Sequence, residues 1–325
     1  MGITYIKKFL PFRKQLYKLK KSYLGKEKRV SYGLENPNIS FYIIGQEDMC
    51  GGLFWLINKV VMHIGYAIDK GYIPVVDFLH YKTQYSTKEN FGKINLWELF
   101  FEQPCGYNLE SIGNSKNIII NKMAPAPHKK YLMGQYEFYN QPKRIEYFRD
   151  IFHKYIKFNK TTKSILTKTY NDITKGETNI IGVLCRGTDY IILKPKGHPI
   201  QPSQEMVVED VRNTMKKYNC RYVFLATEDE DIFQYFKQQF GQQLLFLEQE
   251  RTSKNNMSGD KYLAQERELD KKRNPYDDAI KYLSAIYILS RCKCFIGGCT
   301  GGTKGVLLMT KGFEYNKIYD LGLYK

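Results

Sequence analysis

The sequence predicts an α/β protein in which two open domains face a cleft. Three observations carry this prediction. The length of 325 residues suggests about two domains. Strand-like and helix-like segments alternate from residue 35 onward. Each half also has a glycine-rich turn after a strand, and ligands of open α/β sheets bind at the carboxyl ends of the strands.

The first half begins with a βαβ unit. A strand over 41–45 leads to the turn Asp48-Met49-Cys50-Gly51-Gly52, which opens a helix that ends at Gly71. Further along, we expect a strand over 73–77, a polar loop over 80–95, a short helix starting at 97–100, a strand over 118–120 and a helix-rich region over 136–170. These segments predict a first domain over residues 35–172.

The second half repeats the alternation and predicts a domain over residues 173–325. Its expected strands are 179–185, 222–226, 244–247 and 294–298. Its expected helices are 204–218, 230–239, 277–290 and one from about residue 303. Two connections are expected to be exposed loops, one over 187–203 and a highly charged one over 248–275.

The positive charge is concentrated at the N-terminus. The net charge is +17, and residues 1–30 carry ten Lys or Arg and a single acidic residue. Apolar residues recur there at helical spacing, at Phe12, Leu16, Leu19 and Tyr23. Residues 1–34 are therefore expected to form a separate segment with a basic amphipathic helix. Such a helix is suited to an anionic membrane surface, through residues 6–29, or to docking on the protein's own core.

Composition excludes several other classes. No recognition motif supports nucleic-acid binding. No apolar run approaches the ~20 residues that span a bilayer, and the N-terminus has no secretory signal, so a cytosolic protein is expected. The seven cysteines lack paired CxxC spacing, and five lie in or beside apolar strand-like runs. Reduced, mostly buried thiols are expected, with no metal site.

The strand over 179–185 ends in a charged segment, Arg186-Gly187-Thr188-Asp189, which is followed by His198-Pro199-Ile200. An arginine at the end of a buried strand is suited to phosphate, because its planar guanidinium donates two parallel hydrogen bonds. The alternative is a structural pair between Arg186 and Asp189 at the end of the strand.

A second glycine-rich turn, Gly297-Gly298-Cys299-Thr300-Gly301-Gly302-Thr303, follows the last predicted strand. Backbone N–H groups at a helix N-terminus favour an anion. The turn lacks the spacing of a Walker or dinucleotide motif, and its alternative is a tight structural turn. Together with Arg186, it predicts a diphosphate site in which the arginine supplies charge and the turn supplies neutral donors.

Four segments resemble a known enzyme family. LCRGTDY is similar to an HxRRTDK segment, His198-Pro199-Ile200 stands at the matching distance, and YVFLATEDEDIF and YILSRCKCFIGGCTGG match in order. The family is the fucosyltransferases of the GT-B type, which includes the α-1,6-, nodulation and O-fucosyltransferases. The resemblance covers roughly residues 180–310. It implies two Rossmann-like domains and an inverting, metal-independent transfer of fucose from GDP-fucose.

The resemblance also implies site residues. Arg186 matches the arginine that holds the β-phosphate, and Asp189 matches an aspartate of the same loop. Thr300 and Gly301 stand where the family has a phosphate-contacting Ser-Ser pair. We expect the donor to be bound by Arg186, Asp189, His198, Glu228, Asp229, Thr300, Gly301, Gly302 and Thr303, with no cofactor and no metal.

Four departures from the family pattern mean that phosphate binding carries over better than recognition of the nucleobase or the catalytic base. Leu184 replaces a histidine, and Gly187 replaces a second arginine. Lys194 replaces the catalytic glutamate, and Ala285 replaces an aspartate that recognises the nucleobase of the donor. An inverting transfer still needs a group that takes the proton of the acceptor hydroxyl. The candidates are Glu47, Asp48, Asp189 and His198, and we assign catalytic roles to Asp48, Asp189 and Arg186.

Each of these residues has a structural alternative. Asp48 could be the N-cap of the helix that follows it. His198 could orient the long loop, and Glu228 and Asp229 could be plain turn residues. Lys194 could face the diphosphate or be a solvated loop charge.

The sequence thus predicts a cytosolic glycosyltransferase of surface polysaccharide synthesis, peripheral at the inner membrane face. Its expected partners are a nucleotide-sugar donor and a glycan or lipid-linked glycan acceptor. The alternatives are a transferase that uses another nucleotide-linked donor and a non-catalytic nucleotide- or glycan-binding protein.

Overall fold

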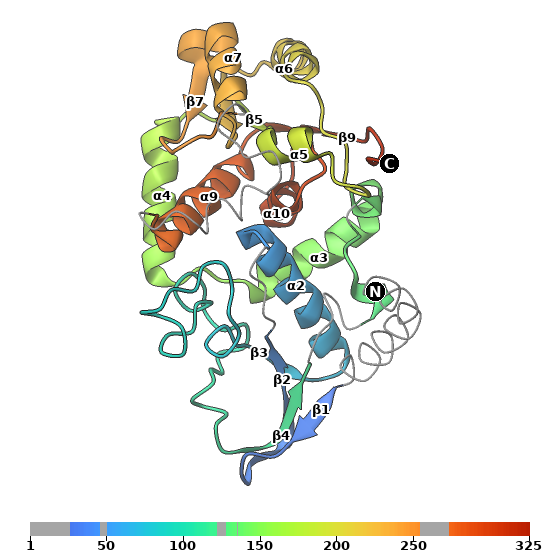
Figure 1. The fold of residues 1–325 in the computed structure, drawn as a ribbon, viewed down its shortest axis with the longest axis vertical. Helices are drawn as coiled ribbons and strands as arrows, with labels where there is room; N and C mark the ends of the chain where they lie inside the picture. The colour runs from blue at the N-terminus through green and yellow to red at the C-terminus, as the bar shows by residue number, and fades with distance from the viewer. Residues whose placement is uncertain (1–26, 46–50, 122–127, 135, 254–272) are drawn as a thin grey trace, which may run out of the picture.

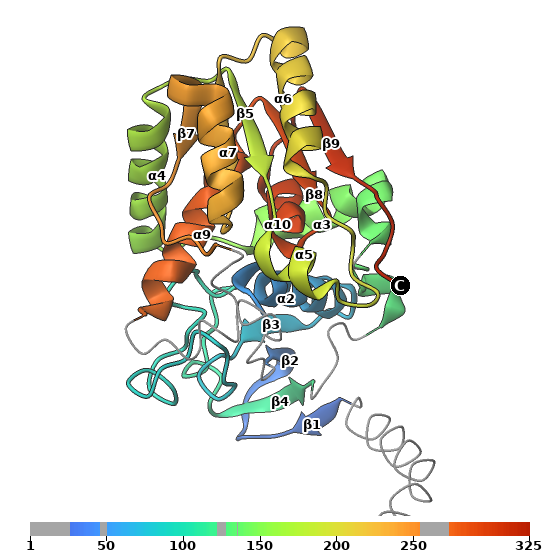
Figure 2. The same ribbon diagram turned by 45° about the horizontal axis from the view of Figure 1, so that its top comes forward.

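A computed structural model describes residues 27–45, 51–121, 128–134, 136–253 and 273–325. Two sheets lie at opposite ends of the long axis of this part, with helices between them (Figures 1 and 2). The expected α/β class is confirmed. The predicted N-terminal helix and the residues Glu47 and Asp48 lie outside the described residues.

The smaller sheet has the strand order β1-β4-β2-β3. Its strands are β1 (Lys28–Val30), β2 (Glu35–Ile44), β3 (Ile73–Val76) and β4 (Ser115–Ile120). β2 pairs in parallel with both β3 and β4, and β1 is antiparallel to β4. Sequence analysis missed β1 because it is a three-residue edge strand without apolar alternation.

The larger sheet is parallel throughout, with the strand order β7-β6-β5-β8-β9. Its strands are β5 (Ile180–Leu184), β6 (Tyr222–Ala226), β7 (Leu244–Phe246), β8 (Cys294–Gly298) and β9 (Tyr315–Tyr319). β5 and β8 are buried along their whole length, as expected for the centre of a parallel sheet. Sequence analysis missed β9, an edge strand that is only partly buried.

The helices pack against the two sheets. They are α2 (Leu53–Asp69), α3 (Pro142–Tyr155), α4 (Lys160–Thr174), α5 (Thr188–Leu193), α6 (Gln204–Tyr218), α7 (Glu230–Phe240), α9 (Pro275–Leu289) and α10 (Gly301–Met309), with short 3-10 turns η2 (Lys129–Tyr131), η3 (Glu137–Asn140) and η4 (Gly241–Gln243). One apolar cluster runs from β2 and α2 through α3 to α9 and α10. A second cluster packs α6 and α7 on the other face of the larger sheet.

Two local expectations are wrong. Residues 97–100 form turns instead of a helix, and the Trp97 and Phe101 rings stack there with their centroids 4.3 Å apart. The loop over 187–203 is interrupted by α5. The six described cysteines are free thiols, and five of them are buried, as expected.

α4 lies in the part of the sequence assigned to the first domain, yet it packs against α9 of the second half. Tyr170 of α4 meets Tyr287 of α9 edge to face, with ring centroids 6.3 Å apart. The domain boundary at residue 172 stays a prediction.

Candidate functional site at the carboxyl edge of the larger sheet

The carboxyl ends of three neighbouring strands bring the predicted donor residues to one edge of the larger sheet. Leu184 at the end of β5 pairs with Ala226 of β6 on one side and with Gly297 of β8 on the other. Arg186, Glu228 and Thr300 therefore each follow a strand at the same edge. Arg186 and Thr300 are 114 residues apart in the sequence.

Arg186 meets Glu228 across this edge. The Arg186 Nε lies 3.5 Å from the Glu228 Oε1, and their side chains are 30% and 14% exposed. The same carboxylate accepts the backbone N–H of Gly187 at 3.1 Å. The predicted pairing of Arg186 with Asp189 stays untested, because the side chains of residues 188–190 are not described. Asp189 is part of α5.

Asp229 is completely buried and packs against the loop that follows β5. It is the N-cap of α7 and accepts the backbone N–H of Ile232 at 3.0 Å. A Cβ at Gly187 would lie 2.1 Å from the Asp229 Oδ2, so no side chain fits at position 187. This contact explains why glycine stands where the resembled family has a second arginine.

Hydrogen bonds within the Thr300 turn stabilise the start of α10. Thr300 is the N-cap, and its hydroxyl accepts the backbone N–H of Thr303 at 3.1 Å. The Thr303 hydroxyl donates to the Gly298 carbonyl at 2.5 Å, and Thr303 is fully buried. The next two residues, Gly301 and Gly302, begin the helix, and their N–H groups point out of its first turn. This arrangement is suited to an anion.

The N-termini of α10 and α2 meet at this turn. A Cβ on Gly301 would lie 3.8 Å from the backbone nitrogen of Trp55, and the Asn58 amide donates to the Gly301 carbonyl at 3.3 Å. The Tyr139 hydroxyl, which belongs to η3, donates to the Thr300 carbonyl at 2.6 Å. Residues of the first half therefore hold the glycine-rich turn of the second half.

The start of α2 has no side-chain cap. Its N-cap is Gly52, so the alternative role of Asp48 as N-cap is wrong. The Tyr85 hydroxyl accepts the backbone N–H of Leu53 at 2.8 Å, and the Gln84 amide donates to the Gly51 carbonyl at 2.6 Å. The catalytic roles proposed for Asp48 and Glu47 remain predictions.

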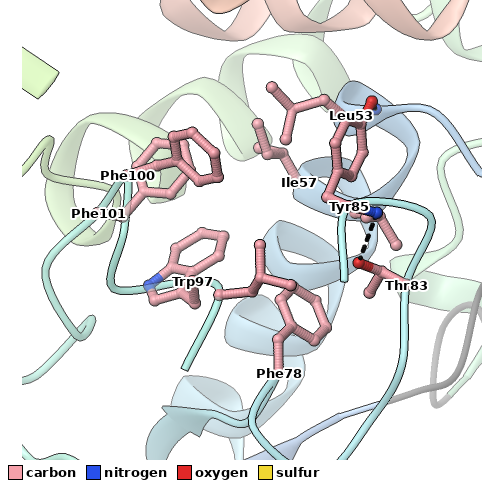
Figure 3. A pocket seen from close by; sticks show the side chains of 10 residues that line it. Leu53, Ile57, Phe78, Thr83, Tyr85, Trp97, Phe100 and Phe101 are labelled. Atoms are coloured by element: carbon pink, nitrogen blue, oxygen red, sulfur yellow. Dashed lines mark hydrogen bonds between the residues drawn. The ribbon is translucent and has the colours of Figure 1, made fainter. Parts of the chain in front are cut away.

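A small apolar pocket of about 20 Å³ lies beside this end of α2 (Figure 3). Its lining is aromatic and aliphatic, with polar groups from Thr83, Tyr85 and Trp97, and the Trp97 indole N–H donates to the Glu102 carbonyl. The Thr83 hydroxyl accepts the backbone N–H of Tyr85 at 3.3 Å. The pocket belongs to the apolar cluster that fixes α2, and its polar groups are engaged locally.

His198 lies where the chain passes the C-terminal residues. Its backbone N–H donates to the Pro195 carbonyl, and its carbonyl accepts the N–H of Tyr324 at 2.9 Å. Pro199 pairs with Leu323. Lys194 is exposed at the C-cap of α5, in a left-handed conformation. These contacts join the loop to the C-terminal residues through the backbone, and both roles of the His198 side chain stay predictions.

Three residues that sequence analysis did not single out support the edge. The Gln201 amide donates to the Cys299 carbonyl at 3.4 Å and ties the loop after α5 to the Thr300 turn. The Arg251 guanidinium stacks 3.8 Å from the Phe233 ring centroid. Lys304, in the first turn of α10, is only 4% exposed. Lys304 directly follows the turn in the sequence, but nothing in the sequence indicates its burial.

In the described residues, no cluster of three His, Cys, Asp or Glu side chains is arranged to hold a metal ion. Within the same part of the chain, no helix is both long enough and apolar enough to cross a membrane.

Comparison with known proteins gives similarity to solved structures alone. No family model matches the sequence, and no curated protein matches it. The chain is similar to NodZ alpha-1,6-fucosyltransferase co-crystallized with GDP, at 15% identity over 84% of this chain and 93% of that chain, with a TM-score of 0.47. A structure of fucosyltransferase NodZ from Bradyrhizobium has 15% identity, the same coverage and a TM-score of 0.44. POFUT1 in complex with GDP has 10% identity over 87% of this chain and 99% of that chain, with a TM-score of 0.49. These are likenesses of fold.

Proposed function

We propose that this protein is a glycosyltransferase that transfers a sugar from a nucleoside-diphosphate donor to a glycan acceptor. The observation that carries the proposal is the convergence of Arg186 and the first turn of α10 at one edge of a parallel sheet. Open α/β sheets bind their ligands at this edge. A guanidinium beside unblocked backbone N–H groups is a binding site for phosphate.

The same groups are suited to drive the transfer. When the bond between the sugar and the diphosphate breaks, negative charge develops on the leaving diphosphate. Arg186 and the N–H groups of Gly301 and Gly302 stabilise that charge, without a metal ion in this proposal. In an inverting transfer, a base takes the proton of the acceptor hydroxyl as it attacks the sugar. Asp48 and Asp189 are the proposed bases.

We further propose that the donor is GDP-fucose and that the acceptor is a glycan or lipid-linked glycan of a surface polysaccharide. The support is the order and spacing of the four resembling segments, from Arg186 to the Thr300 turn. Work at the inner membrane face, with residues 6–29 as a peripheral contact, rests on the basic N-terminus.

The test is slow hydrolysis of the donor. Incubation with GDP-fucose should release GDP and free fucose. Arg186→Ala should lower the rate about 100-fold or more, because a preorganised donor of charge is lost at the leaving group. Arg186→Lys should recover only part of it, since lysine lacks the planar fork. Arg212→Ala removes an exposed arginine of α6, which contacts Gln239, and should leave the rate unchanged.

Other outcomes would change the assignment. A thermal shift with UDP but not with GDP would indicate a UDP-linked donor instead of GDP-fucose. Binding of GDP-fucose without release of GDP, in the presence of glycan acceptors, would indicate a non-catalytic binding protein. Equal rates for Arg186→Ala and the unaltered protein would overturn the proposed site.

A further inference from the structure

Lys304 is a buried cation that forms no ion pair with the described residues. Only 4% of its surface is exposed, and it lies in the first turn of α10. Within the described part of the chain, its ammonium group has no hydrogen bond and no ion pair. Its neighbours are aromatic, with the Nζ 5.9 Å from the Phe138 ring centroid and 5.7 Å from that of Tyr139. A buried charge of this kind is costly unless something pairs with it.

The ammonium group lies beside the start of α10. Side chains on a helix lean toward its N-terminus, so the long Lys304 side chain extends back along the first turn. Tyr139, whose ring is near the Nζ, donates its hydroxyl to the Thr300 carbonyl at 2.6 Å. The cation and the Thr300 turn are therefore held by the same tyrosine.

The electrostatics of this position favour an incoming anion. Burial lowers the pKa of Lys304 to about 8, and the Cys299 thiol and the Glu137 carboxyl raise it only in part. Glu137, Tyr139 and Cys299 are the titratable groups that face the ammonium from the packed elements. Burial raises the pKa of the Cys299 thiol to about 11, so this thiol is neutral at neutral pH and does not balance the charge.

The backbone supplies two donors in the same helical turn as Lys304. As the first residues of α10, Gly301 and Gly302 have N–H groups without an intrahelical acceptor. Arg186, by contrast, already meets the Glu228 carboxylate. Among the described residues, Lys304 thus lacks the close carboxylate partner that Arg186 has, and it belongs to the same first turn as the two N–H groups.

We propose that Lys304 is a ligand of the donor diphosphate and binds a phosphate oxygen together with the N–H groups of Gly301 and Gly302. This inference rests on the proposed function and names a residue of the same site. It gives the diphosphate a second cation besides Arg186. It also makes binding depend on the protonation of one lysine.

The test compares the affinity for nucleoside diphosphates by calorimetry, with GDP, UDP and CDP as probes. Lys304→Met keeps the length and removes the charge. It should weaken the best-bound diphosphate about tenfold or more, the scale of one hydrogen bond to a charged group. Lys311→Met removes an exposed lysine two residues after α10 and should leave the affinity unchanged. Lys304→Met should not lower the melting temperature, because it removes an unpaired buried charge.

The pH dependence of the unaltered protein gives a second measurement. Bound diphosphate favours the charged lysine, so the affinity should be constant below a pH of about 8 and should fall above it, with proton uptake on binding. In Lys304→Met, this fall should be absent.

Three outcomes are distinguishable. If the unaltered protein binds diphosphate and Lys304→Met binds it equally tightly, the role of Lys304 is wrong and the proposed function stands. A flat affinity of the unaltered protein through a pH of about 8 would overturn that role in the same way, even if the variant does not fold. If the unaltered protein binds none of the three probes, the donor site and the role of Lys304 both fail.

Discussion

At the scale of single residues, the site requires a position without a side chain, Gly187, in addition to its polar side chains. Gly187 lies against Asp229, and the absence of a Cβ lets the loop after β5 pass directly over the loop after β6. This approach brings the backbone N–H of Gly187 within 3.1 Å of the Glu228 carboxylate, which also meets Arg186.

Gly187→Ala should therefore destabilise the protein by about 1–3 kcal/mol, as overpacking of a tight contact does. A new Cβ would lie 2.1 Å from the Asp229 Oδ2 and 2.6 Å from its Cβ. Urea unfolding measures the change. In an Asp229→Gly background, the same substitution should cost much less, because glycine is tolerated as the N-cap of α7 and leaves room. An equal cost in both backgrounds would contradict the proposed clash.

At the scale of elements, α2 and α10 determine how the two halves join. Phe54 of α2 is 1% exposed, and its ring meets Tyr282 of α9 edge to face at 5.4 Å. A Cβ on Gly305 of α10 would lie 2.1 Å from the Phe54 ring. The two helices approach closely because this position carries no side chain.

Gly305→Ala should lower the free energy of unfolding, although alanine in a helix interior normally stabilises by about 0.5–1 kcal/mol relative to glycine. The sign reverses because the methyl group meets the Phe54 ring. In a Phe54→Ala background, which removes the whole ring, the substitution should become neutral or stabilising. Chemical denaturation of the four proteins in this cycle measures the coupling, and simple additivity would show that the two positions do not interact.

At the scale of the whole molecule, the charge is uneven. Residues 1–30 carry ten of the 50 Lys and Arg residues and a single acidic residue. Each basic residue near an anionic membrane surface is worth about 1 kcal/mol, so this segment is the part of the chain best suited to membrane contact.

Removal of residues 1–26, which keeps β1, should abolish sedimentation with vesicles that contain anionic lipid and should leave the release of GDP from GDP-fucose unchanged. The association of the full chain should also weaken as salt rises, because the attraction is electrostatic. The same partition with and without the segment would remove the proposed peripheral contact.

The sequence was sufficient for most elements and for the edge where the site lies. α6 and β6 begin and end at the residues expected from periodicity, because their apolar spacing and turn residues are local. The prediction of a phosphate site at Arg186 and the Thr300 turn also comes from the sequence, since residue type and position after a strand are properties of the sequence.

Only the tertiary structure decided which groups are buried and what they meet. That α4 packs on α9, that β9 closes the larger sheet and that Gly187 faces Asp229 depend on segments distant in sequence. The same is true of Lys304, whose exposure is set by Phe138 and Tyr139 of η3. Periodicity fixes the conformation of a segment, whereas the solvation of a charge depends on what the rest of the chain places over it.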